Sequence, residues 1–449
     1  MTPDDVAALK LAHPDLSSIE LVFPDMNGVA RGKHLPANQS DKLFGKVRLP
    51  LATYNIDILS LDTEAAGIAI ERGDPDGYCH VVAGGPALWS GGRHAVALMT
   101  MTTPEGAPNP YDPRQVLARV LEQFTAAGLT PVVAPELEFY LLDATRDATG
   151  RAQPPLSPVT GERLSDPQVY RLSVLDPFMP IMDDIRAACH ALGVAAETAS
   201  AEFGPGQFEI NLGHTADALS AADQAVLLKH AIRGVARQHG MEACFMAKPY
   251  GEESGSGLHF HISLLNADGE NVFTGVTADQ LNEPLSGAVA RLKNTMAEAM
   301  LVFAPHLNSF RRLAPGTYAP MVAAWGFDNR GVALRVPTTT GPAARVEHRT
   351  AGADANPYLV LAALLQAIFD GLGGGDPGPP AHTEATEADG PVLPLGWGRA
   401  IAAFEESAFV KRALGSEFAR VYALMKRQEM ERLRTRVTDV EFDVYMRSV

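Results

Sequence analysis

Cysteine is scarce in this chain of 449 residues. Its three cysteines, Cys79, Cys189 and Cys244, lie far apart and form no Cys-x-x-Cys pair. This pattern excludes a disulfide-stapled scaffold and a thiolate zinc site. Hydrophobic residues make up 46% of the chain, which is enough to build large apolar cores.

Positive charge is also in deficit, with 37 Lys and Arg against 53 Asp and Glu, a formal net charge of −16. Such a balance argues against nucleic acid or an anionic membrane as the main partner. No uncharged apolar run approaches the length of a membrane span, and the acidic start, Met1 to Asp5, lacks the apolar stretch of a secretory signal. We therefore predict a cytoplasmic enzyme that binds neither nucleic acid nor membrane.

The length exceeds that of one typical domain, and no internal repeat of solenoid period is visible. We predict a small N-terminal domain over residues 1–105 and a large domain over residues 106–449. Strand and helix patterns alternate, but several strands are joined by short loops, which favours an antiparallel or mixed sheet. The fold class expected is α+β.

The local patterns predict individual elements. Strands are expected at 18–23, 95–100, 131–142, 207–212 and 257–265. Helices are expected at 114–127, 177–192, 220–239, 292–303, 358–372 and, for the most part, 401–436. Loops are expected at 63–78, 144–165 and 371–390, and a basic segment leaves the first turn at 31–33.

Acidic and imidazole side chains gather in four short, strand-like segments. These are Pro135–Phe139, Glu202–Glu209, Gly257–His261 and Val346–Arg349. In a strand, residues i and i+2 point to the same face, so Glu136 shares a face with Glu138, and His259 shares one with His261. Carboxylates that converge in apolar surroundings need a cation, and oxygen ligands with one nitrogen suit Mg²⁺ or Mn²⁺.

Each segment also has a plainer interpretation. The two glutamates of the first segment could face solvent, although their neighbours are apolar. The Gly-Pro turn between Glu202 and Glu209 could carry acids by chance, and the two histidines could be satisfied core residues. Only the four segments together favour a metal site.

Arginines cluster between residues 308 and 349. They are Arg311, Arg312, Arg330, Arg335, Arg345 and Arg349. Arginine grips carboxylates and phosphates bidentately, so this density beside an acidic site suits an anionic substrate such as a nucleotide polyphosphate or an amino acid. Surface ion pairs are the alternative, except for Arg335, whose apolar neighbours predict burial.

These segments, in this order, resemble class I-type glutamine synthetases over nearly the whole chain. Asp25–Lys33 matches the family's Asp-x-Asn-Gly-x-x-Arg-Gly-Lys segment, and Asn308–Pro320 matches its flap segment. The resemblance implies the glutamine synthetase fold, with an N-terminal β-grasp domain and a catalytic domain whose curved, mainly antiparallel sheet is flanked by helices. It also implies a dodecamer of two hexameric rings, with active sites shared between neighbouring subunits.

The resemblance further implies ATP, glutamate and two or three Mg²⁺ or Mn²⁺ ions. Glu138, Glu202 and Glu209 would hold one ion; Glu136, His259 and Glu347 would hold a second. Glutamate would be bound by Arg312 and Arg349, with Ser254 and Gly255 beside it. Arg330 would stabilise the transferred phosphoryl group, and the nucleotide would be contacted by His261, Arg335 and Arg345.

Three departures from the family pattern bear on function. Tyr318 stands where glutamine synthetases carry a catalytic glutamate in the flap segment. A phenol stays neutral at pH 7 and offers an apolar face to a carbon-bearing amine. The Phe-Asp-Gly-Ser-Ser segment is absent, with Asp57 as a possible remnant, and Ser254 replaces an asparagine that helps hold glutamate.

The departures favour the γ-glutamylpolyamine and γ-glutamylamine synthetases of this family. We predict an ATP-dependent ligase that joins glutamate to a primary amine through γ-glutamyl phosphate, in the setting of amine catabolism. Polyamines, ethanolamine and simple monoamines all remain possible acceptors. Two alternatives stay open: a true glutamine synthetase that uses ammonium, and a catalytically silent oligomer with a structural or regulatory role.

Overall fold

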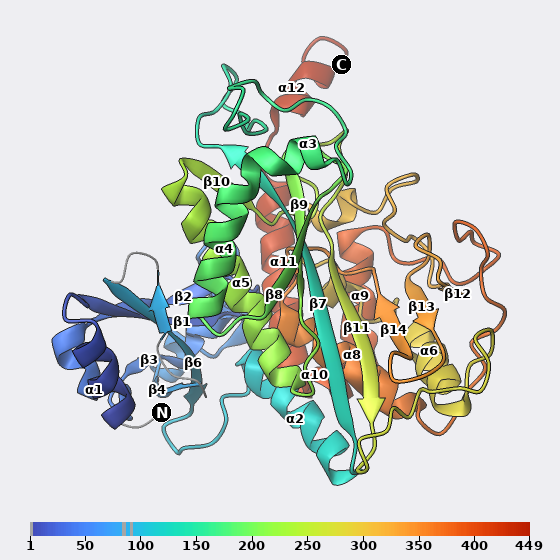
Figure 1. Cartoon of the computed structure of the whole chain (residues 1–449), viewed down its shortest axis with the longest axis horizontal. Helices are drawn as coiled ribbons and strands as arrows, with labels where there is room; N and C mark the ends of the chain where they lie inside the picture. Colours follow the sequence, from blue (N-terminus) through green and yellow to red (C-terminus); the bar gives the residue numbers. More distant parts are fainter. Residues whose placement is uncertain (1–2, 83–86, 90–92) are drawn as a thin grey trace.

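The computed structural model describes residues 3–82, 87–89 and 93–449. Residues near the N-terminus form one sheet, at the left of Figure 1, in the order β2-β1-β6-β4-β3, with β5 also paired to β6. Its strands are β1 (Ser18–Pro24), β2 (Ala30–Pro36), β3 (Arg48–Pro50), β4 (Asp76–Val81), β5 (Ala87–Trp89) and β6 (His94–Thr102). β1 runs parallel to β6 and antiparallel to β2.

The second sheet is larger and carries the acidic segments. Its order is β12-β13-β14-β11-β7-β9-β8, with β10 paired to β7. All its pairs are antiparallel except that of β12 with β13. The strands are β7 (Thr130–Asp143), β8 (Ala196–Ala201), β9 (Gln207–Leu212), β10 (Met241–Cys244), β11 (Leu258–Leu265), β12 (Trp325–Phe327), β13 (Leu334–Thr338) and β14 (Arg345–His348).

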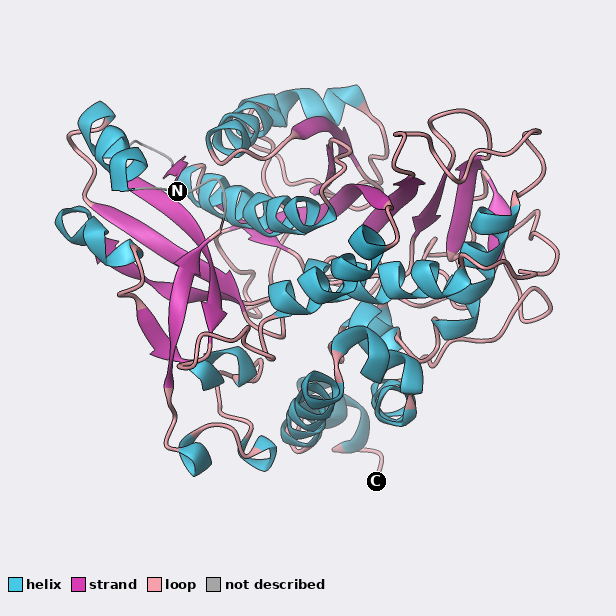
Figure 2. Cartoon of the chain, turned by 90° about the horizontal axis from the view of Figure 1, so that it is seen from below, coloured by secondary structure: helices cyan, strands magenta, loops and turns pink. Residues whose placement is uncertain are grey.

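The α-helices are α1 (Pro3–Ala12), α2 (Pro113–Ala126), α3 (Leu172–Leu175), α4 (Met179–Ala191), α5 (Ala218–Gln238), α6 (Glu283–Thr295), α7 (Met300–Phe303), α8 (Pro357–Gly371), α9 (Trp397–Glu406), α10 (Ala408–Leu414), α11 (Ser416–Arg434) and α12 (Asp439–Tyr445). Most of the helices pack around this large sheet, as Figure 2 shows, whereas α1 lies beside the N-terminal sheet and α12 projects at the margin in Figure 1. One continuous apolar core joins both sheets and the helices. The predicted α+β class, with a curved sheet flanked by helices, is confirmed.

The helix ends follow from local sequence. α2 begins where the Asp112 side chain accepts a hydrogen bond from the backbone N–H of Arg114, and Pro113 fills the first turn. It ends before Gly128, whose φ of +67° stops the helix. Asn356 and Pro357 begin α8 in the same way. These signals explain why both helices were predicted to within two residues.

Four element predictions need correction. The basic segment 31–33 belongs to β2, an exposed edge strand whose polar residues show no apolar alternation. The loop predicted over 63–78 contains the first residues of β4. The helix predicted over 292–303 begins earlier, at Glu283, and breaks before α7; Gly287 weakened the helical pattern. The segment 401–436 is three helices rather than one.

Gly287 has a structural reason to be glycine. A Cβ atom there would lie 1.9 Å from the backbone oxygen of Gly371, because α6 and α8 cross at this point. The close approach of the two helices therefore requires a residue without a side chain.

None of the helices in the described part of the chain combines the length and apolar character that a membrane crossing would need.

Candidate active site

Strand register brings the predicted acids and histidines together on one face of the large sheet. Glu136 of β7 lies opposite His259 of β11 on one side and opposite Asn211 of β9 on the other. In the same way, Glu138 pairs with Glu209. Leu137 and Phe139, which alternate with the two glutamates along β7, are fully buried on the opposite face. The alternation inferred from the sequence is therefore what gathers these charges.

Glu202 reaches the same face by a different route. It was assigned to a strand-like segment, but it follows the end of β8 and lies in the turn that leads to β9. The backbone N–H of Glu202 donates to the carbonyl of Gln207, which closes the turn. Ser200 donates a hydrogen bond of 3.0 Å to the Glu202 carboxylate.

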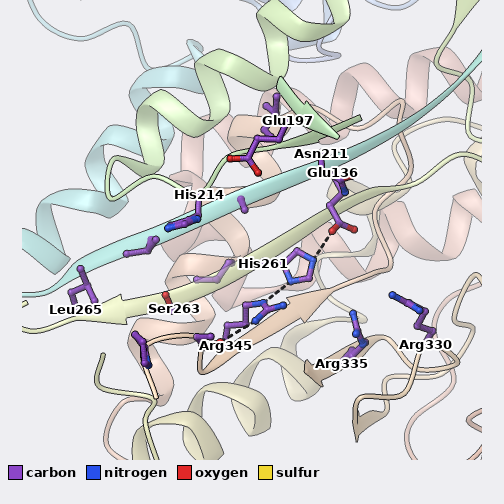
Figure 3. A pocket seen from close by; sticks show the side chains of 16 residues that line it. Glu136, Glu197, Asn211, His214, His261, Ser263, Leu265, Arg330, Arg335 and Arg345 are labelled. Atoms are coloured by element: carbon purple, nitrogen blue, oxygen red, sulfur yellow. Dashed lines mark hydrogen bonds and ion pairs between the residues drawn. The ribbon is translucent and has the colours of Figure 1, made fainter. Parts of the chain in front are cut away.

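Two cavities open on this face. One has a volume of about 700 Å³ and is drawn in Figure 3; the other has a volume of about 600 Å³. We call them the β11 cavity and the flap cavity. All fifteen predicted site residues line one or both. The β11 cavity contains His261 and Arg345, and four residues line both cavities: Glu136, Asn211, Arg330 and Arg335. The remaining predicted residues line the flap cavity: Glu138, Glu202, Glu209, Ser254, Gly255, His259, Arg312, Tyr318, Glu347 and Arg349.

The junction of the two cavities has the donors for metal ions. Ligand atoms of Glu136, Glu209 and His259 lie within 4.8 Å of one another, and so do those of Glu136, His261 and Glu347. Glu136 belongs to both groups. The family resemblance predicts two different sets of ligands at the same junction. One set is Glu138, Glu202 and Glu209, and the other is Glu136, His259 and Glu347.

Two carboxylates at this junction lack neutralising partners close enough to keep them ionised. Burial, together with the negative charge of Glu138, raises the pKa of Glu202 to about 7. Burial, with the charges of Glu138, Glu136 and Glu202, raises the pKa of Glu209 to about 9. Crowded, buried carboxylates of this kind are stabilised by a bound cation.

The pKa of Glu347 is shifted in the opposite direction. Burial alone would raise its pKa, but the charges of Arg349 and His261 outweigh burial and hold the pKa at about 2. Its carboxylate accepts hydrogen bonds from Arg335 at 2.8 Å and Arg349 at 2.5 Å. The side chain of Glu347 is fully buried, so these ion pairs hold two arginines at fixed positions beside the metal donors.

A hydrogen-bonded chain connects the junction to the β11 cavity. Nε2 of His261 lies 2.9 Å from Glu136, and Nε of Arg345 lies 3.1 Å from Nδ1 of His261. Figure 3 shows these three side chains in line across β7, β11 and β14. Burial alone would raise the pKa of Glu136, but the hydrogen bonds and charges of His259 and His261 lower it below the usual range.

Arg312 closes the far end of the flap cavity. It is buried and donates hydrogen bonds to the backbone oxygens of Thr350, at 2.9 Å, and Arg349, at 3.3 Å. Burial lowers the pKa of Arg312. Gly255 must be glycine because a Cβ atom there would lie 2.5 Å from the backbone oxygen of Ala247 and 2.7 Å from Cγ of Arg312. An anion that enters this end would meet buried guanidinium groups.

Comparison with known proteins identifies the fold and the family. The family description "Glutamine synthetase, catalytic domain" matches residues 110–445. The gamma-glutamylputrescine synthetase of Escherichia coli is 40% identical over 440 residues, which cover 96% of this chain and 92% of that protein. This chain belongs to the glutamine synthetase family.

Two further proteins are similar to this chain over most of their length. The gamma-glutamylethanolamide synthetase of Streptomyces coelicolor is 32% identical, covering 96% of this chain and 93% of that protein. A solved structure of a GmaS complex with ADP superposes with a TM-score of 0.84 at 25% identity, covering 98% of this chain and 99% of that one.

The structure shows where the residues lie that depart from the glutamine synthetase sequence pattern. Tyr318 lines the flap cavity, with 62% of its surface exposed and a φ of +53°. The backbone oxygen of Ser254 accepts a hydrogen bond from the Tyr140 hydroxyl at 2.6 Å. Asp57 is fully buried, and its carboxylate accepts a hydrogen bond from Gln428 of α11 at 2.8 Å. Asp57 therefore does not line either cavity of its own chain.

Sequence reasoning missed several residues of this glutamine synthetase site. Asn211 follows Glu209 by two positions in β9, so strand alternation alone would have found it. Gln207 donates to the carbonyl of Gly255 at 3.0 Å. Tyr170 and Phe203 also line the flap cavity. Both lie in irregular segments, for which the sequence gives no periodic signal.

Proposed function

We propose that this protein is an ATP-dependent ligase that joins the γ-carboxylate of glutamate to a primary amine. The observation that carries the proposal is the position of Tyr318: an aromatic side chain, rather than an acid, lines the cavity that holds the arginines and the metal donors. Similarity to ligases whose names specify putrescine and ethanolamide products supports it. The bound molecules would be glutamate, ATP and a small amine.

In the first step, a γ-carboxylate oxygen of glutamate attacks the γ-phosphorus of ATP, and the bond to the ADP oxygen breaks. This gives γ-glutamyl phosphate and ADP. Arg312 and Arg349 would hold the glutamate in the flap cavity, with Ser254 and Gly255 at its edge. Arg335, Arg345 and His261 would hold the nucleotide phosphates. Arg330 lines both cavities, which suits a role on the phosphoryl group in transit.

In the second step, the amine nitrogen attacks the γ-carbonyl carbon, the bond to phosphate breaks, and a proton leaves the nitrogen. The products are the γ-glutamyl amide and inorganic phosphate. Tyr318 has a phenol in place of a carboxylate and therefore brings no carboxylate charge to ammonium. Its ring can instead contact the carbon atoms of an organic amine.

Members of this family use divalent metals and ATP, and the donor set fits such ions. Glu138, Glu202 and Glu209 would hold one Mg²⁺ or Mn²⁺ ion, and Glu136, His259 and Glu347 a second, of the two or three ions proposed for each site. When bound, these ions supply positive charge opposite the phosphate oxygens. The raised pKa values of Glu202 and Glu209 support this assignment, because they report carboxylates that a cation would stabilise.

The assembly proposed is a dodecamer of two hexameric rings, in the cytoplasm, with an N-terminal domain over 1–105 and a catalytic domain over 106–449. The residues that line either cavity lie between 132 and 349, and none of the described residues of the N-terminal sheet is among them. Completion of the site by the N-terminal domain of a neighbouring subunit is part of the proposed assembly.

The proposal is tested by phosphate release from ATP in the presence of glutamate, Mg²⁺ and a panel of amines. The panel includes putrescine, ethanolamine, methylamine, n-butylamine and ammonium. We expect release that depends on an organic amine and is weak with ammonium. Equal turnover with ammonium alone would identify a glutamine synthetase, and no turnover with any nitrogen nucleophile would identify a silent oligomer.

A further inference from the structure

The flap cavity contains a pair of exposed aromatic rings, and one of them, Phe203, has no role in the steps proposed above. The ring centroids of Phe203 and Tyr318 lie 5.9 Å apart, and the planes are tilted by 39°. Phe203 is 42% exposed and Tyr318 is 62% exposed. The apolar core, as far as the described residues define it, includes neither ring. An exposed phenylalanine in a polar cavity is costly unless a ligand covers it.

Both rings are held in place by the backbone. Gly204, which follows Phe203, donates to the Gln207 side chain at 2.9 Å, and the carbonyl of Phe203 accepts a hydrogen bond from Gln168 at 3.2 Å. The Tyr318 backbone is in the left-handed region, which bulky residues rarely adopt. The hydroxyl of Thr317 bonds to the carbonyl of Arg312 at 3.0 Å and so connects this turn to the arginine.

The surroundings determine which part of a substrate the pair meets. Glu202, next to Phe203 in the chain, is a metal donor of the proposed site, and Arg312 is the proposed glutamate ligand. The charged parts of glutamate and the phosphoryl group are therefore matched by other residues of the cavity. What remains for two apolar ring faces is the uncharged carbon chain of the second substrate.

We infer that Phe203 is a specificity-determining residue, which together with Tyr318 binds the carbon chain of the acceptor amine by apolar contact. The inference rests on the proposed ligase function. Ammonium has no carbon to cover the rings, and methylamine has one. Longer alkyl chains bury more apolar surface against the pair and are favoured accordingly.

The test compares kcat/KM for n-butylamine with that for methylamine at saturating glutamate, ATP and Mg²⁺. Both amines use the same metals and the same acyl phosphate, so a displaced Glu202 would affect them equally and the ratio would not change. We expect Phe203→Ala to lower the ratio about 10-fold, which is the discrimination that a few apolar contacts supply. Tyr318→Ala, which removes the other ring, should lower it similarly.

Two further variants serve as controls. Phe203→Leu keeps most of the apolar area and should hold the ratio within about threefold of the wild type. Leu156→Ala truncates a residue with the same exposed fraction of 42% in a separate cavity and should not change the ratio.

Each outcome decides the inference. An unchanged ratio in both alanine variants, or a loss in Phe203→Leu equal to that in Phe203→Ala, would overturn binding by apolar contact. Failure of the wild type with every amine would instead overturn the proposed ligase function. Wild-type turnover combined with an unchanged ratio in both alanine variants would overturn the role of the two rings and leave the proposed ligase function standing.

Discussion

At the residue scale, two glutamates of one site have opposite electrostatic surroundings. Glu347 lies between two arginines and has a pKa held at about 2, whereas Glu209 lies among carboxylates and has a pKa raised to about 9. Glu347 therefore stabilises the protein without a cation, while Glu209 destabilises it until a cation arrives. The carboxylates around Glu209 repel one another, and a cation bound among them would relieve that repulsion.

Glu209→Gln tests this directly. The folded-state pKa of Glu209 is raised above its usual 4.5, so the destabilisation is absent below about pH 4.5 and grows as pH rises toward 9. Without metal, the glutamine variant should melt a few degrees higher than the wild type at pH 8 and at the same temperature near pH 4.5. Thermal denaturation at both pH values measures this difference.

Mg²⁺ should reverse the order of the two proteins. It stabilises the wild type by mass action, while the variant, which lacks one donor oxygen charge, should gain much less. The control is Glu197→Gln, which changes a carboxylate in the β11 cavity outside the described metal-donor groups. An identical Mg²⁺ response of Glu209→Gln and the wild type would contradict the assignment of Glu209 as a ligand.

Tyr318→Glu restores the acid that glutamine synthetases carry in this segment. A carboxylate can bind ammonium and accept its proton, so the ratio of ammonium to n-butylamine turnover should rise roughly tenfold or more. Tyr318→Phe keeps the ring, adds no charge and should leave ammonium turnover low. If both variants retain the wild-type amine profile, Tyr318 does not discriminate between the acceptors.

At the element scale, the turn between β8 and β9 connects the proposed metal donors to the part of the flap cavity that is proposed to bind glutamate. Gly204 packs directly beneath Tyr140, and a Cβ atom there would lie 1.9 Å from the Tyr140 hydroxyl oxygen. That hydroxyl holds the carbonyl of Ser254 at 2.6 Å. A change in the turn is therefore transmitted to the segment that borders the proposed glutamate position.

Gly204→Ala should displace Tyr140 and weaken glutamate binding. We expect the KM for glutamate to rise about tenfold and the unfolding free energy to fall by about 1–3 kcal/mol, the usual cost of overpacking. Gly251→Ala is the matched control, because a Cβ atom there meets nothing within 4 Å. Steady-state kinetics and thermal denaturation measure the two effects. A normal glutamate KM in Gly204→Ala would show that the turn does not position the substrate.

Sequence periodicity predicted the central elements because buried and exposed side chains alternate regularly along them. Strand β9 was predicted with its observed bounds, and Glu136 and Glu138 do share a cavity face. The missed parts depend on contacts between distant segments. β2 is an edge strand without an apolar pattern, and the helical signal at Gly287 is weak because α8 requires close approach. Phe203 and Tyr170 lie in turns, where no period indicates which side chains face a cavity.

At the scale of the whole molecule, the N-terminal sheet is joined to the C-terminal helices by buried polar contacts. Asn27 donates to Glu429 of α11 at 2.8 Å, and Lys426 donates to Asn27 and bonds to Glu429 at 3.0 Å. All three side chains are nearly fully buried. The N-terminal sheet is therefore fixed to the catalytic part, although it does not line the cavities of its own chain.

The helix α12 projects at the margin of the molecule in Figure 1 and has no buried residue. Apolar side chains of this helix and of the residue that ends it are exposed, with Phe442 at 59%, Tyr445 at 54% and Met446 at 60%. Exposed apolar clusters of this kind mark contact surfaces between proteins. Because the site is proposed to be shared between subunits, we expect α12 to bury these side chains against another copy of the chain.

Replacing Phe442, Tyr445 and Met446 together with serine should leave the fold of the subunit intact, since none of the three contributes to the core. It should lower the mass of the assembly below twelve times the 47.8 kDa chain, and activity should fall with it. Light scattering after gel filtration measures the mass, with Asp443→Asn as the control on the same helix. A full-size assembly formed by the triple variant would show that α12 is not part of the interface.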